Sequence, residues 1–299
     1  MSVGADGSKP TSSSQGPGTR QASPGGARSG RILLAEDNAA NRKLGLAMLD
    51  KLGYTADSAA NGLEAVEAVG RTRYDAILMD CRMPEMDGFR ATAEIRKSEP
   101  SSSRTPIIAM TADAMEGDRQ KCLDAGMDDY LPKPVSFQAL AAVLERWVPL
   151  ANSALKPDPP TPSSSAPRVA EQEPPLDAAI IAGWRQLERV RGPEWLPDLI
   201  SVFLRETESN LERLRLGVEQ KDVETIVGRA HSLAGSVATF GAAAMGRLCR
   251  LMKMLGSEGR LDAAPETLAA LEAEFERVKA AMRAEFPSAF PGSRETAND

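Results

Sequence analysis

The first half of the chain alternates short apolar runs with longer amphipathic segments five times, and this alternation most constrains its fold. The apolar runs lie at 32–35, 54–59, 76–79, 107–110 and 130–131. The amphipathic segments that follow them lie near 40–52, 62–71, 87–98, 113–125 and 135–147. Such alternation is typical of a parallel sheet covered by helices on both faces, and mostly apolar strands are typical of strands buried on both faces. The sequence therefore predicts an α/β domain, a doubly wound (βα)5 parallel sheet.

The second half carries no strand signal. Helical periodicity is found near 177–191, 194–218, 222–240, 242–256 and 263–286. Breaks fall at Gly192-Pro193, at Gly241 and between Gly256 and Gly259. This pattern predicts an all-α, antiparallel four-helix-bundle domain.

Two stretches rich in small residues and proline frame these domains. Residues 1–29 are mostly Ser, Gly and Pro, and residues 150–175 are rich in Pro and Ser. Such compositions bury too little apolar surface to offset the entropy lost on ordering. We therefore expect a disordered N-terminal tail at 1–29, a first domain at 30–149, a linker at 150–175, the helical domain at 176–286 and a disordered C-terminal tail at 287–299.

Charge and composition narrow the classes of partner. The formal net charge is −6, and the helical half has no basic excess, which argues against nucleic acid as a partner because phosphate binding needs a basic face. No apolar run approaches 18 residues and no secretory signal is evident, so we expect no membrane insertion and a cytoplasmic location. The three cysteines show no metal-ligand spacing and are expected to be free thiols.

Acidic residues follow two predicted strands. Glu36 and Asp37 come after the first strand and Asp80 after the third, while Thr111 ends the fourth and Lys133 follows the fifth. The carboxyl ends of parallel strands share one edge of the sheet, so these side chains should meet. Each residue alone has a common structural explanation, such as a helix cap or a turn. Together, three carboxylates suited to Mg²⁺, a hydroxyl and an ammonium are typical of phosphoryl transfer to a carboxylate.

The strings around these positions resemble the response-regulator receiver family. They are Leu-Leu-Ala-Glu-Asp-Asn ending at 38, Met-Asp-Cys-Arg-Met-Pro-Glu-Met-Asp-Gly at 79–88, Met-Thr-Ala at 110–112 and Lys-Pro at 133–134. The resemblance covers about 31–148.

The resemblance implies a role for each of these residues. Asp80 would accept the phosphoryl group, and Mg²⁺ would be held by Glu36, Asp37, Asp80 and the backbone carbonyl of Arg82. Thr111 and Lys133 would grip the phosphoryl oxygens, and the Lys133-Pro134 peptide would be cis. Tyr130 matches the switch aromatic of the family, although a half-buried aromatic at a strand edge is an equally good interpretation.

The only histidine, His231, lies beside the apolar stripe of its predicted helix. Gly228 and Gly235 border it, and glycine inside a helix costs about 1 kcal/mol relative to alanine, so the glycines suggest an open approach to the imidazole. On the helix pattern alone, a boundary histidine bonded to a neighbouring helix is the commoner arrangement.

The segment Ala-His-Ser-Leu-Ala-Gly-Ser at 230–236, with Phe-Gly-Ala at 240–242, resembles the histidine phosphotransfer (HPt) family. This resemblance covers about 180–285 and implies that His231 carries a phosphoryl group. The family usually has lysine three residues after the histidine, where this chain has Ala234. Arg250 and Lys253 on the following helix are candidate replacements for that charge.

These observations predict a phosphorelay protein, a phosphoryl carrier rather than an enzyme, because no ATP-binding kinase motif is evident. An upstream sensor histidine kinase, and another receiver or HPt protein, are the expected partners. Alternatively, the helical domain is an output module that binds a partner without transferring phosphoryl groups, an idea that Ala234 supports. A carboxylate-dependent phosphatase is a further, weaker alternative. Whether Asp80 and His231 exchange phosphoryl groups directly is not evident from the sequence.

Overall fold

The computed structural model describes residues 30–100, 104–111, 116–148 and 174–290, with the backbone alone at 116–119. The N-terminal tail predicted at 1–29, most of the linker predicted at 150–175 and the last nine residues lie outside this range.

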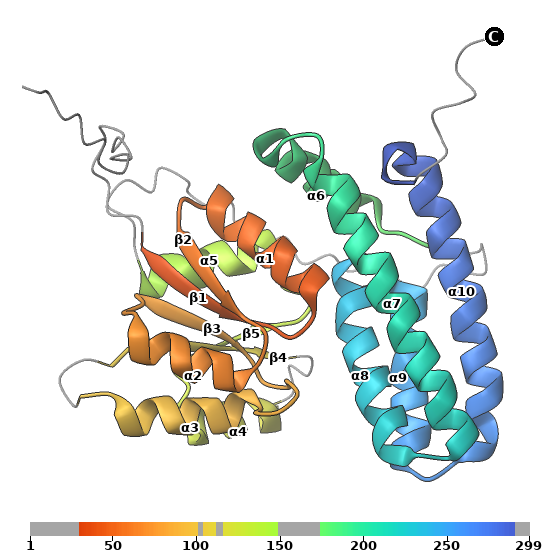
Figure 1. The fold of residues 1–299 in the computed structure, drawn as a ribbon, viewed down its shortest axis with the longest axis horizontal. Helices are drawn as coiled ribbons and strands as arrows, with labels where there is room; N and C mark the ends of the chain where they lie inside the picture. The colour runs from red at the N-terminus through yellow and green to blue at the C-terminus, as the bar shows by residue number, and fades with distance from the viewer. Residues whose placement is uncertain (1–29, 101–103, 112–115, 149–173, 291–299) are drawn as a thin grey trace, which may run out of the picture.

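The first domain is a five-stranded parallel sheet in the order β2-β1-β3-β4-β5 (Figure 1). The strands are β1 (Arg31–Ala35), β2 (Thr55–Ala59), β3 (Ala76–Asp80), β4 (Ile107–Thr111) and β5 (Asp129–Pro132). The helices are α1 (Ala39–Lys51), α2 (Gly62–Arg71), α3 (Gly88–Ser98), α4 (Glu116–Asp124) and α5 (Phe137–Trp147). The predicted doubly wound (βα)5 fold is confirmed.

Two hydrophobic layers sandwich the sheet. Helices α2, α3 and α4 pack on one face, and α1 and α5 pack on the other. Strands β3 and β4 are buried at every position, which is why their sequences are continuously apolar. Asn or Asp side chains accept a hydrogen bond from a first-turn amide of α1, α2 and α3, so the helices begin where the sequence supplies a capping residue.

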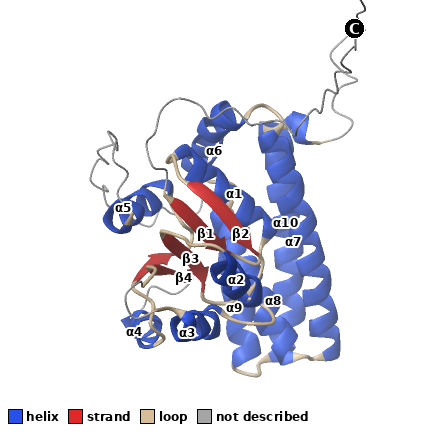
Figure 2. Cartoon of the chain, turned by 60° about the vertical axis from the view of Figure 1, so that its left-hand side comes forward, coloured by secondary structure: helices blue, strands red, loops and turns tan. Residues whose placement is uncertain are grey.

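The second domain consists of helices, which stand beside the sheet as an upright bundle (Figures 1 and 2). Its helices are α6 (Ala178–Arg191), α7 (Trp195–Gln220), α8 (Val223–Thr239), α9 (Ala243–Ser257) and α10 (Ala264–Glu285), with short 3-10 turns at Leu261–Ala263 and Pro287–Ala289. Helices α7 to α10 form the expected four-helix bundle, and α6 packs on α7. Within the described residues, no helix has the length and apolar character needed to cross a membrane.

Aromatic packing holds one end of this bundle together. The rings of Phe203 and Phe240 stack with centroids 4.1 Å apart, and Trp184 tilts against Phe240 at 5.1 Å. This cluster joins α6, α7 and the end of α8. At the C-terminal end of the described residues, Ala289 and Phe290 pack against the same core. The disordered tail predicted from residue 287 therefore begins too early, because the apolar residues there find a surface to cover.

Candidate functional site

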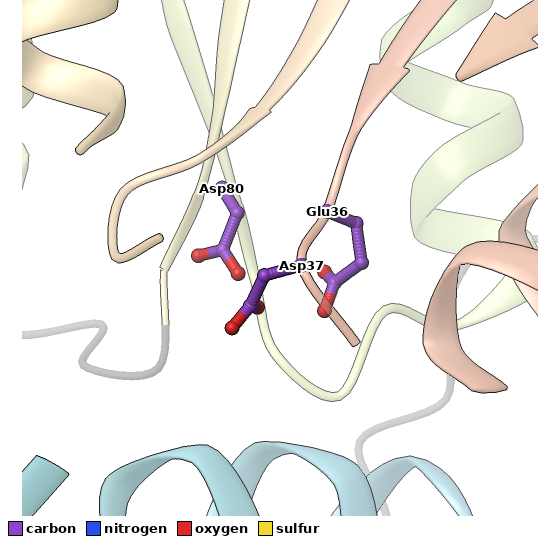
Figure 3. Close-up of side chains that lie close together, drawn as sticks. All are labelled: Glu36, Asp37 and Asp80. Carbon is purple, nitrogen blue, oxygen red and sulfur yellow. The ribbon is translucent and has the colours of Figure 1, made fainter. Parts of the chain in front are cut away.

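Three carboxylates meet at the carboxyl edge of the sheet, where β1 and β3 lie side by side. Glu36 and Asp37 follow β1, and Asp80 is the last residue of β3. Figure 3 shows the three side chains gathered in one place, with carboxylate oxygens that lie within 4.8 Å of one another. The structure therefore brings together the acidic residues that the sequence predicted would meet.

Burial makes these acids hard to ionise together. Desolvation, reinforced by the charge of Glu36, raises the pKa of Asp37 to about 6. Desolvation also raises the pKa of Asp80 to about 7, with Lys133 opposing the rise and Glu36 adding to it. A buried cluster of like charges is stabilised by a proton or by a cation.

Lys133 supplies one such cation. Its Nζ donates hydrogen bonds of 2.6 Å to Glu36 Oε2 and to Asp80 Oδ2. Burial lowers the pKa of Lys133, but the two carboxylates outweigh that effect and raise it, so the ammonium stays charged. The Lys133 amide donates to the carbonyl of Thr111 at 2.7 Å, which holds both residues at the same rim. The Lys133-Pro134 peptide is cis, as the receiver resemblance implied.

Two residues that the sequence did not single out, Asn41 and Arg42, stabilise the loop after β1. Asn41 Nδ2 donates to Glu36 Oε1 at 3.0 Å. Arg42 Nη1 donates to the carbonyls of Glu36 at 2.6 Å and Asp37 at 3.1 Å. Both lie in the first turn of α1, so their spacing from the acids was the available signal.

The glycine that ends the motif around Asp80, Gly88, is required by a close approach between two backbone segments. A Cβ at this position would lie 2.1 Å from the backbone carbonyl oxygen of Asp80. Only glycine permits this close approach between the start of α3 and the end of β3.

His231 faces the acidic site across the boundary between the two domains. A cavity of about 600 Å³ is lined by Glu36, Asp37 and Asp80 from the sheet edge and by His231 from α8. In Figure 3 the helices drawn in blue, from the second domain, run below the three carboxylates. His231 is half-buried and lines the wall of this cavity that belongs to the second domain.

The two glycines beside His231 open onto this cavity. Gly228 and Gly235 both line it, and a Cβ at either position would meet nothing within 4 Å beyond the helix itself. Their position agrees with the open approach to the imidazole that the sequence predicted.

The candidate replacements for the family lysine lie elsewhere. Among the described residues that line the cavity, neither Arg250 nor Lys253 is found, whereas Arg229 is. Ala234 packs against the bundle core, so the third position after the histidine does not face the cavity. Sequence reasoning missed Arg229 because it considered only the helix after α8.

The structure shows where Arg82 and Tyr130 lie but does not test the roles predicted for them. Arg82 lines the cavity, and its amide donates to Asp80 Oδ1 at 3.1 Å. Tyr130 is half-buried and packs against the layer that covers one face of the sheet. Metal binding through the Arg82 carbonyl and the switching of Tyr130 stay predictions.

Cys81 and Cys122 are neighbours in space although they are distant in sequence. Their sulfur atoms are 3.8 Å apart, and Cys81, Cys122 and Cys249 all lie outside any disulfide. Burial raises the pKa of the Cys81 thiol, which keeps it protonated and unreactive.

Two family models match the chain, one on each domain. The response regulator receiver domain matches residues 32–145, and the Hpt domain matches residues 198–281. The chain joins a receiver domain to an Hpt domain. The receiver match ends within α5, and the Hpt match covers most of α7 to α10.

Two relatives match most of this chain. The sensor protein GacS of Pseudomonas syringae pv. syringae is 32% identical over 240 residues, which cover 78% of this chain and 25% of that protein. The signal transduction histidine-protein kinase BarA of Escherichia coli K12 is 34% identical over 247 residues, covering 81% of this chain and 26% of that protein. The chain thus spans about a quarter of the length of these two relatives.

Solved structures match the receiver part. The receiver domain of sensor histidine kinase PA1611 from Pseudomonas aeruginosa, a structure with a magnesium ion coordinated in the active site cleft, is 52% identical. The match covers 40% of this chain and 97% of the PA1611 receiver chain, with a TM-score of 0.38. A second match is the co-crystal structure of the Saccharomyces cerevisiae histidine phosphotransfer protein Ypd1 with the receiver domain of Ssk1. It is 30% identical, covers 41% of this chain and 91% of the matched chain, and has a TM-score of 0.38.

The receiver contacts the Hpt domain mainly through α1. Ala40, Leu44 and Ala47 of α1 belong to the same continuous hydrophobic cluster as the core of the Hpt domain. Helix α1 contacts α6, α7 and α8. Because α1 begins two residues after Asp37, this packing places the acidic site opposite α8.

Proposed function

We propose that the chain carries phosphoryl groups between Asp80 of the receiver and His231 of the Hpt domain. The observation that carries this proposal is the shared cavity, which is lined by both residues. A receiver followed by an Hpt domain supports a role in a phosphorelay. An upstream sensor histidine kinase would supply the phosphoryl group, and a second receiver or Hpt protein would exchange it.

The residues around Asp80 fit a divalent cation. Glu36, Asp37 and Asp80 offer carboxylate oxygens within one small volume, and hard oxygen ligands are the ones that Mg²⁺ prefers. Lys133 provides one positive charge against three carboxylates, so the cluster accommodates further positive charge. Bound there, Mg²⁺ would supply electrostatic stabilisation of the phosphoryl oxygens.

The chain's own residues prepare Asp80 for reaction. In the acceptor step, an Asp80 carboxylate oxygen attacks phosphorus, and the bond from phosphorus to the donor's leaving atom breaks. Lys133, now held by Glu36 and Asp80, would turn toward the incoming phosphoryl oxygens, with the Thr111 hydroxyl as a second donor. Arg42 and Asn41 keep Glu36 and the loop after β1 in place.

Transfer to His231 then exchanges one bond for another. The lone pair of an imidazole nitrogen attacks phosphorus, the bond from phosphorus to the Asp80 oxygen breaks, and its electron pair returns to the carboxylate. The neutral imidazole is the required nucleophile. Gly228 and Gly235 leave the approach open, and Arg229 supplies a positive charge at the cavity wall.

Labelled acetyl phosphate tests this proposal on the full chain with Mg²⁺. Acyl phosphate on Asp80 is destroyed by base, whereas phosphohistidine survives base and is lost in acid. We expect both kinds of label on the wild type, only base-labile label on His231→Gln and none on Asp80→Asn. A first-order rate of phosphohistidine formation that is independent of protein concentration would identify transfer within one chain. Base-labile label alone, unchanged by His231→Gln, would refute direct transfer and favour an output module.

We also propose 30–149 and 176–286 as the limits of the two domains on the sequence observations above, with residues 287–290 added because Ala289 and Phe290 pack against the helical core. A cytoplasmic location is proposed on the same sequence observations.

A further inference from the structure

The first-turn amides of α1 donate hydrogen bonds to acceptors from both domains. Asn38 caps the helix by accepting from the Asn41 amide at 2.8 Å. The amides of Ala39 and Ala40 point outward, as the first amides of every helix do. Glu206 of α7 accepts a hydrogen bond from each of these amides. The Ala39 N–H donates to Oε1 at 2.9 Å, and the Ala40 N–H donates to Oε2 at 3.3 Å. The Hpt domain therefore completes the N-terminus of a receiver helix.

This contact differs from three other polar contacts that join the domains in the described part of the chain. Lys43 pairs with Asp198, Arg191 with Asp50 at 2.9 Å, and Lys51 donates to Gln186 at 3.2 Å. Those contacts join flexible side chains in which at least one partner is exposed, and such pairs contribute little to association. Glu206 instead binds two backbone donors in a partly buried place, where the positive end of the helix dipole also favours a carboxylate.

Glu206 lies where docking of the Hpt domain on α1 and the acidic cluster around Asp80 come close together. Asp37 lies two residues before Ala39 in the chain, so the segment that Glu206 grips runs directly into the acidic cluster. A carboxylate near Glu36 and Asp37 is repelled by them unless donors compensate for its charge. The two amides of α1 provide that compensation, so the contact favours one position of the Hpt domain on α1.

We propose that Glu206 is a positioning residue that seats the Hpt domain on α1 and makes the receiver selective for an Hpt domain with an acid at this point. This inference rests on the proposed transfer between Asp80 and His231. An apolar side chain in place of Glu206 leaves both amides unpaired, glutamine keeps one acceptor oxygen but loses the charge, and a basic side chain is repelled by the positive helix end.

Two substitutions remove the contact from opposite sides. Glu206→Gln removes the charge, and Ala39→Pro removes one donor. Proline is favoured at the first position of a helix, and Asn38, with φ −75° and ψ 119°, already has the extended conformation that precedes proline. Helix α1 should therefore tolerate Ala39→Pro. Glu208→Gln is the matched control, because Glu208 lies on the same helix and its only described ion pair is with Lys279 at 3.5 Å.

The experiment measures formation of phosphohistidine in the full chain after labelling with acetyl phosphate and Mg²⁺. We expect each of Glu206→Gln and Ala39→Pro to slow transfer about tenfold, near the upper range for a charge at a partly buried helix end. The double variant should be little slower than either single one, because both remove the same contact. Glu208→Gln should match the wild type, and the rate of Asp80 labelling should be unchanged in all of them.

A second readout separates seating from a general effect on folding. A donor chain carrying His231→Gln and Glu206→Gln is mixed with an acceptor chain carrying Asp80→Asn, with or without Glu206→Gln in the acceptor. We expect Glu206→Gln in the acceptor to raise the concentration for half-maximal transfer about tenfold and to leave the maximal rate within twofold. Additive effects in the double variant, or transfer unaffected by Glu206→Gln, would overturn the inference while the wild type still transfers. Absence of phosphohistidine in the wild type would instead overturn the proposed function.

Discussion

Protons and Mg²⁺ should compete for the acidic cluster of the receiver, so metal affinity should fall steeply below neutral pH. Burial raises the pKa of Asp37 to about 6 and that of Asp80 to about 7 in the absence of metal, and a bound Mg²⁺ needs both carboxylates ionised. With these pKa values, both are ionised in about 90% of molecules at pH 8 and in roughly 1% at pH 5.5. The affinity should therefore fall about a hundredfold, equivalent to about 2.7 kcal/mol.

The effect on stability has the same origin. An acid with a raised pKa binds its proton more tightly in the folded than in the unfolded chain, so the metal-free receiver loses stability as pH rises from about 4 to about 7. Above pH 7 that cost is complete, and bound Mg²⁺ offsets it. The increase in Tm caused by Mg²⁺ should therefore be larger at pH 8 than at pH 5.5.

Calorimetric titration of the full chain with MgCl2 at both pH values measures the affinity directly. Asp80→Asn should reduce the pH effect to about fourfold, because only Asp37 then titrates. Asp75→Asn is the control: this acid lies before β3, at the opposite end of the sheet, and accepts from the Arg31 amide at 2.7 Å. It should leave the pH effect intact. A change smaller than threefold between pH 8 and 5.5 in the wild type would show that both acids are ionised at pH 5.5 and that the argument from burial is wrong.

Three further predictions concern single residues around the site. Lys133→Met leaves Glu36 and Asp80 buried without their cation. In metal-free urea titrations at pH 8 it should lower the free energy of unfolding by about 3 kcal/mol. No loss would mean that the ion pairs do not stabilise the fold. Arg229→Ala should slow phosphohistidine formation severalfold, since Arg229 lines the cavity, while Arg213→Ala, at an exposed position of α7, should not; equal rates for the two would exclude a screening role. Gly88→Ala should destabilise the receiver by about 2 kcal/mol through its clash with Asp80, whereas Gly70→Ala, with nothing within 4 Å, should stabilise α2 by up to about 1 kcal/mol. Thermal melting distinguishes these two glycines, and a stable Gly88→Ala variant would contradict the close approach.

The amino-acid sequence by itself determined the two folds and the acidic site. Apolar runs and helical periodicity are local signals, and they placed the strands and helices within a few residues of their observed limits. Residues that follow parallel strands meet at one sheet edge for topological reasons, so the meeting of Glu36, Asp37, Asp80 and Lys133 was predictable before any coordinates were known.

Only the tertiary structure decided how the two domains meet. The contact between α1 and the Hpt domain joins residues far apart in the sequence, such as Ala39 and Glu206, which are 167 positions apart. No local periodicity encodes such a pairing. The same is true of the cations around His231: helical spacing suggested Arg250 and Lys253, but packing turned Ala234 toward the core and left Arg229 at the cavity. Which face of a helix is buried depends on what packs against it, and that partner is here a separate domain.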